Sequence, residues 1–345
     1  MDPLTHSFLG MATALVVARR YTPRGQVALA GLAAGLLPDT DVFLRNAADP
    51  LFFIEYHRHF THSLAFSPVI AALAAGIVWL IYRVVARRSI AVTPLLLPAW
   101  LAGLSHIFCD LWTSYGTRVW WPFSDARVSL DWVAVVDPLL TLPLLVLTVL
   151  ALTKQRGARK HAALGLASVS LYLGLAIVQH HRASTAVSQW LAQSGGTSPT
   201  PVQITVKPSI ANIIVWRALI RDPDGVRVMA VRCGLGATEI LNPSPPHYAA
   251  FATPADAVAA FGLSADSVQA SDIKRFFHFS DDWVGVHPQH PQVLGDLRYA
   301  SLPDDIRPLW GIHLQPSHPE ARVEWQQFTE MEPGAVKRLW GMIWK

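Results

Sequence analysis

Four long apolar runs in the first half of the chain limit its possible folds more than any other feature. They cover residues 65–82, 91–104, 133–152 and 162–178, and two shorter apolar segments precede them at 8–18 and 26–38. About 20 consecutive apolar residues are needed for an α-helix to cross a lipid bilayer. Only 15% of the 345 residues are charged, which is low for a soluble protein. The pattern predicts a polytopic α-helical membrane bundle of about six helices, two of them short.

The basic residues between these runs predict how the bundle is oriented. Ten of them lie in the loops after the first, third and fifth apolar segments, namely Arg19, Arg20, Arg24, Arg83, Arg87, Arg88, Lys154, Arg156, Arg159 and Lys160. The opposite loops carry only Arg45, Arg58, Arg118 and Arg127. Loops rich in Lys and Arg stay on the cytoplasmic side. The chain is therefore predicted to enter and leave the bundle on the outer side of the membrane. This loop pattern accounts for the net charge of +4, so no nucleic-acid partner is predicted.

The second half of the chain has a different composition and period. Residues 191–201 are rich in Ser, Gly, Thr and Pro, which is typical of a linker. Beyond them, strands are predicted on both sides of a turn at 224–225 and at 296–302 and 308–314, with helices at 254–263 and 335–344. The chain is therefore predicted to consist of a helical bundle at 1–190, a linker at 191–201 and a small extracytoplasmic α+β domain at 202–345.

Histidine and aspartate residues gather at one end of the predicted bundle. In the predicted topology all of them fall at the outer ends of the apolar segments, namely His6, Asp39, Asp41, His57, His59, His62, His106, Asp110, Asp131 and Asp137. Residues placed independently would be spread over both ends. Carboxylates at membrane depth are also costly, and they are usually functional. The convergence predicts a functional site there.

These residue types favour a metal site. Imidazole nitrogens and carboxylate oxygens are ligands that suit zinc best here, with manganese or iron as alternatives. His106 and Asp110 are four residues apart, so on a helix their side chains lie about one turn apart on one face. Asp39 and Asp41 are separated by one residue. One of them is expected to bind the metal, while the other accepts a proton or orients a ligand histidine.

Each of these signals has a simpler explanation when taken alone. A single His-x3-Asp pair is a weak motif, His57 or His59 fits an interfacial ring beside lipid headgroups, and Asp39 fits a residue that ends a helix. The sequence "HPQH" at 287–290 is at most a weak surface site. The two cysteines, Cys109 and Cys233, indicate neither a disulfide framework nor a thiolate metal site. Only the convergence of the histidines and aspartates in the first half supports a metal centre.

Several short motifs in this region occur together in one order. They are "DPLTHSFLG", "LLPDTD", "HRHFTHSL", "SHIFCDLWTSYGTRVWWPF" and "DWVAVVDPL", and they cover about the first 140 residues. With these motifs the chain resembles the YdjM-type family of membrane-bound, metal-dependent hydrolases. The resemblance implies a location in the bacterial inner membrane. It also implies His57 and His62 as the functional pair, and it makes His59 less secure.

The order of the candidate ligands resembles a second group of enzymes. The order His, Asp, His and then His-x3-Asp is similar to that of zinc-dependent phospholipase C and related nucleases, which implies the ligands His6, Asp39, His62, His106 and Asp110. A later His-x3-Glu, which would complete a three-metal cluster, is not evident in the sequence. One or two metal ions are therefore expected, and the phosphoester specificity rests on analogy alone.

The expected function is that of an integral-membrane hydrolase that uses metal-activated water. Asp41 or Asp39 is expected to act as the general base, and Arg58 to stabilise an anionic group of the substrate. Membrane lipid is the expected partner, and a lipid or lipid-linked ester or phosphoester is the expected substrate, because such a molecule reaches the site from the bilayer. No particular protein partner is indicated.

Three other functions are weighed against the hydrolase. The first is a noncatalytic scaffold, in which the metal only holds the helices together and the protein binds a partner. The second, less favoured, is a metal-ion transporter, because transport sites usually lie near the bilayer midplane and these residues lie at one end. A metalloprotease of the HExxH type is disfavoured because this motif does not occur in the sequence.

Overall fold

The computed structural model describes residues 1–154, 156–193, 203–222, 225–330 and 332–344. The chain divides into two compact units. The first unit contains residues 1–44, 56–177 and 210–212, and the second contains residues 45–55, 178–209 and 213–345. The predicted linker at 191–201 falls for the most part on residues 194–202, which lie outside the described part of the chain.

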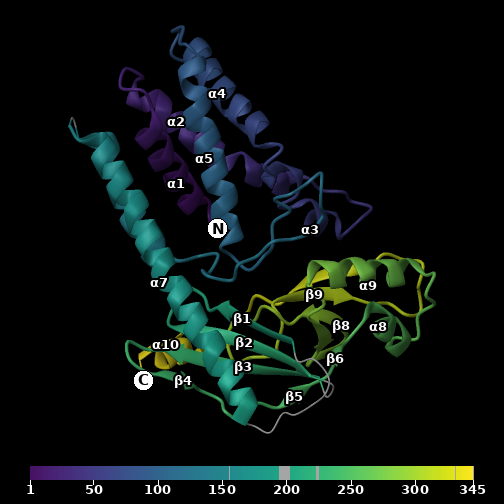
Figure 1. Ribbon diagram of the computed structural model, residues 1–345. Coiled ribbons are helices and arrows are strands. Elements are labelled where there is room, and N and C mark those ends of the chain that lie inside the picture. Colours follow the sequence, from purple (N-terminus) through teal and green to yellow (C-terminus); the bar gives the residue numbers. More distant parts are fainter. Residues whose placement is uncertain (155, 194–202, 223–224, 331, 345) are drawn as a thin grey trace. The chain divides into compact units, whose positions relative to one another are not determined.

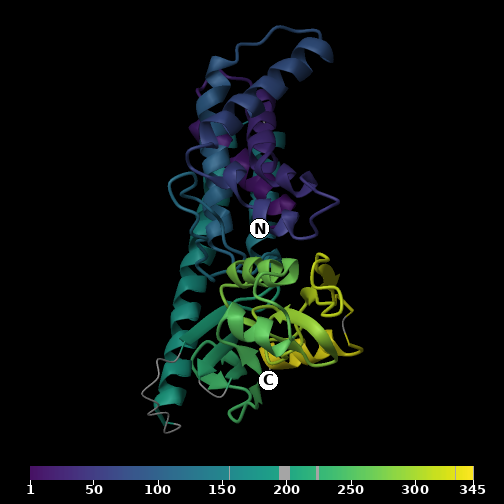
Figure 2. The same ribbon diagram turned by 90° about the vertical axis from the view of Figure 1, so that its right-hand side faces the viewer.

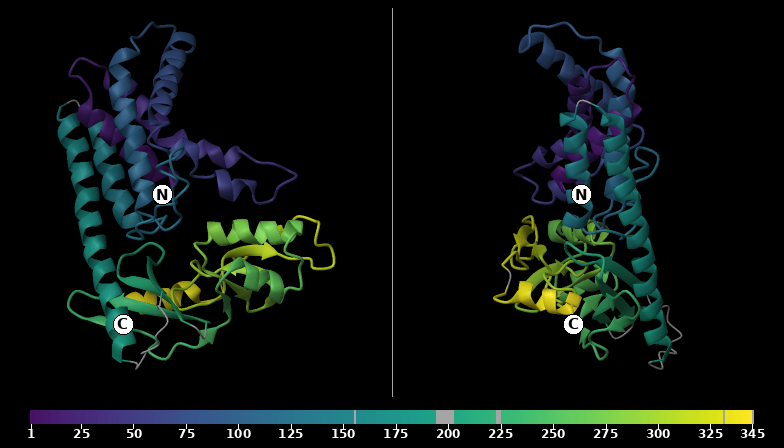
Figure 3. Two further views of the ribbon diagram at one scale, coloured as in Figure 1. Left: turned by 45° about the vertical axis from the view of Figure 1, so that its right-hand side comes forward. Right: turned by 90° about the vertical axis from the view of Figure 1, so that its left-hand side faces the viewer.

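Helices occupy the six predicted apolar segments. They are α1 (Pro3–Val17), α2 (Arg24–Leu36), α4 (Ser67–Val84), α5 (Thr93–Leu111), α6 (Pro138–Thr153) and α7 (Ala158–Gln193). Within the described residues, α4, α5 and α7 are long and apolar enough to cross a membrane, while α1 and α6 are apolar but shorter. The predicted helical membrane region thus contains three candidate spans and shorter apolar helices, and the predicted bundle of about six membrane helices is not confirmed. Figure 3 shows α7 as one unbroken helix along its whole length.

The helices of the first unit pack through small residues. Helix α1 contacts α2, α5 and α6, and α4 contacts α2 and α5. Figures 1 and 2 show α1, α2, α4 and α5 side by side. A Cβ atom added to Gly31 would lie 2.5 Å from the carbonyl oxygen of Gly10, and one added to Gly35 would lie 2.5 Å from that of His6. The backbones of α1 and α2 are therefore in direct contact, which is typical of helix pairs in membranes. This contact brings His6 beside the end of α2.

Short segments connect the helices at the end where His6 lies. Pro38 starts the 3₁₀ helix η1 (Pro38–Phe43) directly after α2, and it places Asp39 and Asp41 in one tight turn. The five-residue helix α3 (Phe52–Tyr56) and the 3₁₀ helix η2 (Phe60–His62) follow before α4 begins. The turn in η1 and the short helix η2 carry three of the residues that the sequence marks as functional.

The second unit is built on two antiparallel sheets. One has the order β1-β2-β3-β4, with β5 also paired to β3, and the other has the order β10-β9-β8-β7-β6. The first contains β1 (Gln203–Pro208), β2 (Val215–Asp222), β3 (Gly225–Cys233), β4 (Thr238–Ile240) and β5 (His247–Tyr248). The second contains β6 (Ala250–Phe251), β7 (Val284–His287), β8 (His290–Asp296), β9 (Trp310–His313) and β10 (Glu324–Gln327). Three helices accompany them, α8 (Pro254–Ala260), α9 (Val268–Phe279) and α10 (Ala335–Trp344).

Most of the elements predicted for the second half are present. Strands β2 and β3 pair as an antiparallel hairpin, β9 lies within the predicted strand 308–314, and α8 and α10 match the predicted helices. The predicted strand at 296–302 is wrong, because β8 ends at Asp296. There the buried Arg298 folds back to pair with the Asp296 carboxylate at 2.9 Å, so the chain turns. Helix α9 was not foreseen.

The glycine contact between α1 and α2 leads to a test of stability. Gly31→Ala should lower the free energy of unfolding by about 1–3 kcal/mol, because the added methyl group overlaps the backbone of α1. Gly76→Ala is the matched control, because Gly76 also lies within a helix and a Cβ there meets nothing within 4 Å. Unfolding of detergent-purified protein measures both. Equal stability of the two variants would contradict the close contact.

Candidate metal centre

Four side chains of the first unit come together as a possible metal-binding group. They are Asp39 from η1, His62 from η2, and His106 and Asp110 from α5, and one ligand atom of each lies within 4.8 Å of the others. His62, His106 and Asp110 are buried, whereas the Asp39 side chain is 20% exposed. The group therefore has one side open to the surroundings.

The spacing of the ligand atoms fits a tetrahedral ion. His62 Nε2 lies 3.0 Å from His106 Nε2, 3.3 Å from Asp39 Oδ1 and 3.2 Å from Asp110 Oδ2. His106 Nε2 lies 3.3 Å from Asp110 Oδ2 and 3.8 Å from Asp39 Oδ1. Ligand atoms around a tetrahedral zinc are separated by roughly 3.3 Å, since each bond is about 2.0–2.1 Å long. Two nitrogen and two oxygen atoms at this spacing suit a divalent transition metal.

Hydrogen bonds to the outer nitrogen of each histidine orient its ring. His106 Nδ1 donates to the carbonyl oxygen of Gly35 at 2.8 Å, which leaves the lone pair of Nε2 directed at the group. His62 Nδ1 lies 2.9 Å from Thr61 Oγ1 and 3.3 Å from Asp41 Oδ2. Ligand histidines of metal sites are held in this way by carbonyl or carboxylate partners. The glycine contact between α1 and α2 supports this orientation, because Gly35 is part of it.

Asp41 lies outside the group and supports it. Its carboxylate accepts hydrogen bonds from the Thr61 hydroxyl at 2.7 Å, the backbone amide of Arg58 at 3.0 Å and His57 Nδ1 at 2.7 Å. Burial opposes its ionisation, but the hydrogen bonds from His57 and His62 hold the pKa of Asp41 well below its usual range. Asp41 is therefore a carboxylate anion that links His62 to His57. Of the two adjacent aspartates, Asp39 faces the metal group and Asp41 orients the histidines.

His6, also predicted as a ligand, borders the group from α1. Its ring stacks on that of His106 with 3.7 Å between centroids. Its Nε2 lies 3.2 Å from Asp110 Oδ1 and 3.9 Å from Asp39 Oδ2. These are the carboxylate oxygens that do not face His62 Nε2. A second ion bridged by these carboxylates would use such atoms, but the Arg58 guanidinium already lies 3.1 Å from Asp110 Oδ1. The geometry therefore favours one ion, with His6 beside it.

His57 and Arg58 take positions that differ from those expected from the sequence. His57, predicted as a ligand, is not in the four-residue group and is hydrogen-bonded to Asp41 instead. Arg58, predicted to contact substrate, is buried and directs its guanidinium to Asp110 and to the Thr113 hydroxyl at 2.8 Å. Its backbone has a φ of +59°, which is rare for a residue with a side chain. This conformation allows its amide to reach Asp41 while its side chain reaches Asp110.

Three other residues that the sequence predicts at the outer end also lie outside the four-residue group, namely His59, Asp131 and Asp137. Asp137 caps α6 by accepting the amide of Leu139, and it accepts the Tyr172 hydroxyl at 2.6 Å. His59 has its ring 5.5 Å from that of Trp121. Asp131 lies in the loop before α6 and has a positive φ of 56°. The structure thus gives Asp137 a role in helix capping.

Two residues that hydrogen-bond to the ligand histidines were not predicted from the sequence, namely Gly35 and Thr61. Gly35 acts through its carbonyl oxygen, which any residue possesses, and the only hint was a glycine spacing of four with Gly31. Thr61 belongs to none of the residue types that the sequence marks as functional, and its hydroxyl lies between Asp41 and His62. Contacts of this kind depend on how separate segments meet.

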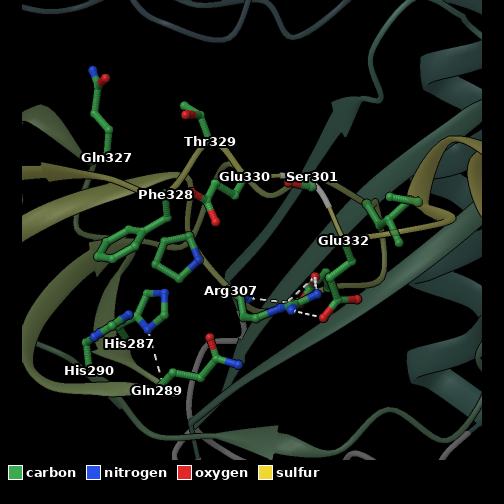
Figure 4. Close-up of a pocket in the computed structure, with 14 residues that line it drawn as sticks. His287, Gln289, His290, Ser301, Arg307, Gln327, Phe328, Thr329, Glu330 and Glu332 are labelled. Atoms are coloured by element: carbon green, nitrogen blue, oxygen red, sulfur yellow. Dashed lines mark hydrogen bonds and ion pairs between the residues drawn. The ribbon is translucent and has the colours of Figure 1, made fainter.

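The second unit contains a cavity of about 470 Å³, which Figure 4 shows. His287 and His290 of the "HPQH" sequence line it, with ring centroids 4.6 Å apart, and both rings contact Phe328. Arg307, also in the lining, pairs with Asp305 and Glu332. Among the described residues, the only group of three or more possible metal ligands is the one in the first unit. Within the described residues, His287 and His290 are therefore not part of a group of three or more possible metal ligands.

Comparisons with known proteins place the first half of the chain in a family. Residues 1–183, just over half of the 345 residues, match the family described as YdjM inner membrane protein. The chain is also similar to the uncharacterized protein YfhP of Bacillus subtilis (strain 168), with 29% identity over 144 residues. This alignment covers 40% of the chain and 42% of YfhP, so it spans less than half of that relative. No solved structure matches the chain.

The four-residue group predicts which substitutions remove metal. His106→Ala and Asp110→Asn should each lower metal content to well below one ion per chain, because the first removes a ligand nitrogen and the second removes the negative charge of a buried ligand. His59→Ala should leave metal content unchanged, because His59 is not in the group. Elemental mass spectrometry of folded, detergent-purified variants measures this. Loss of metal in His59→Ala alone would contradict the assignment.

The charge state of His62 predicts how metal binding depends on pH. Burial opposes protonation, but contacts with Asp110, Asp39 and Asp41 raise the pKa of His62 to about 10 in the metal-free protein. Metal must then displace this proton, so apparent affinity should fall by about tenfold for each pH unit below 10. Competition with a chelator at pH 6.5, 7.5 and 8.5 tests this slope. Affinity that is constant over this range would show that no proton is displaced.

Proposed function

The chain belongs to the family of YdjM inner membrane proteins, and from this premise we propose that it is a membrane-bound, metal-dependent hydrolase. One observation carries the proposal, namely the buried group of Asp39, His62, His106 and Asp110, whose ligand atoms have the spacing of a tetrahedral ion. Zinc is the metal that suits two nitrogen and two oxygen ligands best, and manganese or iron are alternatives. When bound, the metal would supply positive charge that polarises a substrate oxygen and activates water for attack.

Asp39 is the ligand at which substrate would approach. It is the most exposed of the four ligands, with its side chain 20% accessible, and its Oδ1 lies farther from His106 than the Asp110 carboxylate does. Catalytic zinc sites usually keep three protein ligands and one open position. We therefore assign to Asp39 the ligand position that opens. An Asp39 carboxylate released in this way would be a proton acceptor close to the reacting atoms.

The pair of His57 and Asp41 is the second candidate for moving a proton. The Asp41 carboxylate accepts a hydrogen bond from His57 Nδ1, which fixes the tautomer and leaves Nε2 as the second ring nitrogen available for proton transfer. The His57 side chain is 20% exposed, so it can meet a substrate or water. In this proposal Asp41 acts through His57 and His62, and Arg58 holds the Asp110 carboxylate in place.

Exposed apolar side chains close to the site support a lipid or lipid-linked substrate. Val42, Phe43 and Leu44 directly follow Asp41, and their exposed fractions are 38%, 81% and 39%. Trp120 and Phe123, at 54% and 88% exposed, flank Trp121, whose ring contacts that of His59. Such side chains favour contact with acyl chains and headgroups. An ester or phosphoester of a membrane lipid is the proposed substrate class, and cleavage of soluble esters alone would argue against it.

A noncatalytic scaffold stapled by metal is the second candidate function. It is favoured by the number of ligands, because four protein ligands complete a tetrahedral shell, and closed shells are typical of structural sites. Asp39→Asn distinguishes the two functions. A hydrolase should keep metal through the remaining three ligands and lose activity, whereas a scaffold should lose stability together with its metal. Metal transport remains a less favoured proposal.

We also propose that the second unit lies on the extracytoplasmic side of the inner membrane. The proposal rests on the distribution of Arg and Lys among the loops of the first unit. A cysteine introduced at the exposed position Leu235 should react with a membrane-impermeant maleimide in intact cells with a permeable outer envelope. Reaction only after lysis of the inner membrane would reverse the orientation.

Turnover of lipids tests the proposed hydrolase directly. Zinc-loaded or manganese-loaded protein in detergent should cleave long-chain phospholipids or lipid-linked phosphates faster than their water-soluble counterparts. His57→Ala should lower kcat by about 100-fold or more, which is the usual contribution of a positioned acid or base. His59→Ala is the control and should stay close to wild type. Metal-loaded protein that cleaves none of these compounds, or a His57→Ala variant with full activity, would contradict the proposal.

A further inference from the structure

A segment of the first half of the chain is built into the second unit. Residues 45–55 leave the first unit after Leu44 and return to it at Tyr56. Leu51 and Ile54 of this segment are fully buried, and the ring of Phe53 meets the edge of Trp325 with 5.0 Å between centroids. Apolar burial of this kind shows that the segment is part of the packed interior of its unit and is not a loose loop.

Arg275 of α9 binds this segment at two points. Its guanidinium pairs with both oxygens of Asp49, at 2.7 and 3.0 Å, and with both oxygens of Glu55, at 2.5 and 2.9 Å. It also donates to Asp272 on its own helix at 2.9 Å. All four residues lie in the second unit. Paired hydrogen bonds between Arg and a carboxylate are among the strongest and most directional polar contacts in proteins.

The ends of the segment lead directly to the metal centre. Glu55 belongs to α3, and His57 follows the last residue of that helix. Asp41 lies four residues before the segment begins, in η1. His57 and Asp41 are hydrogen-bonded at 2.7 Å, and Asp41 also contacts the ligand histidine His62. The hydrogen-bonded pair thus closes a loop of chain whose middle is held by Arg275.

We propose that Arg275 is a positioning residue that restrains residues 45–55, the segment of chain that connects the two members of the hydrogen-bonded Asp41–His57 pair. The inference rests on the proposed metal centre, because the positioned pair orients His62. A segment of this length without anchors would sample many conformations, and ordering it would cost free energy each time the pair forms. Arg275 removes this cost by holding both carboxylates of the segment.

Loss of metal to a chelator measures the effect of the anchor without requiring activity. Arg275→Gln should speed metal loss by about tenfold, which is typical when a residue that orients a ligand is changed. Arg275→Lys should be intermediate, because it keeps the charge but cannot form paired hydrogen bonds. Arg322→Gln is the matched control, because Arg322 contacts Asp272 of the same cluster at 2.6 Å. A folded Arg275→Gln variant that loses metal at the wild-type rate would overturn the proposal.

A second measurement separates failure of this inference from failure of the metal centre. A nitroxide label on Ala47→Cys reports the mobility of the segment by electron paramagnetic resonance, whether or not metal is bound. Arg275→Gln should raise that mobility and Arg322→Gln should not; unchanged mobility overturns the anchor. If Arg275→Gln does not fold, the double variant Asp49→Asn, Glu55→Gln removes the same contacts and leaves Arg275 paired with Asp272. It should then show the faster metal loss and the higher mobility, and wild-type values for both would overturn the proposal.

Discussion

The carboxylate of Asp110, buried at the end of α5, is the constraint on which the rest of the site depends. An ionised carboxylate in an apolar interior is costly unless it is compensated by positive charge or by metal. His6, His62 and His106 all lie within 3.3 Å of it, and so does the Arg58 guanidinium. These residues come from α1, η2, α5 and the loop before η2. The need to compensate one charge thus brings separate segments to one point, and a divalent ion there would satisfy it most completely.

The helix packing makes this convergence possible. Gly10, Gly31 and Gly35 let the backbones of α1 and α2 approach closely. The carbonyl oxygen of Gly35 therefore reaches His106, and the ring of His6 stacks on the ring of His106. Larger side chains would hold the helices apart and leave both rings without their partners. The small residues of this helix pair therefore serve the site as well as the fold. The same contact fixes the proton of His106 on Nδ1, because the carbonyl oxygen of Gly35 accepts it.

Two residues of the site have different roles from those that their positions in the sequence suggest. Asp41 is one of the two general bases that the sequence predicts, yet it accepts hydrogen bonds from Thr61, Arg58 and His57, so it is better suited to orient than to react. His57 is predicted as a ligand, but it is hydrogen-bonded to Asp41 and is the more exposed of the two residues, which fits its proposed part in proton transfer. The contacts of residues outside the four-residue group are those that the sequence did not predict.

The sequence by itself determined the apolar helices, the family and the set of residue types at one end of the bundle. Helix periodicity and hydropathy are local properties, so these features, and the His106–Asp110 pair one turn apart, could be read along the chain. Only the tertiary structure decided between Asp39 and Asp41, separated His57 from His62, and ended β8 where a strand was expected to begin. Those outcomes depend on distances between segments far apart in the chain. Such distances follow from packing and from compensation of buried charge, which no local pattern encodes.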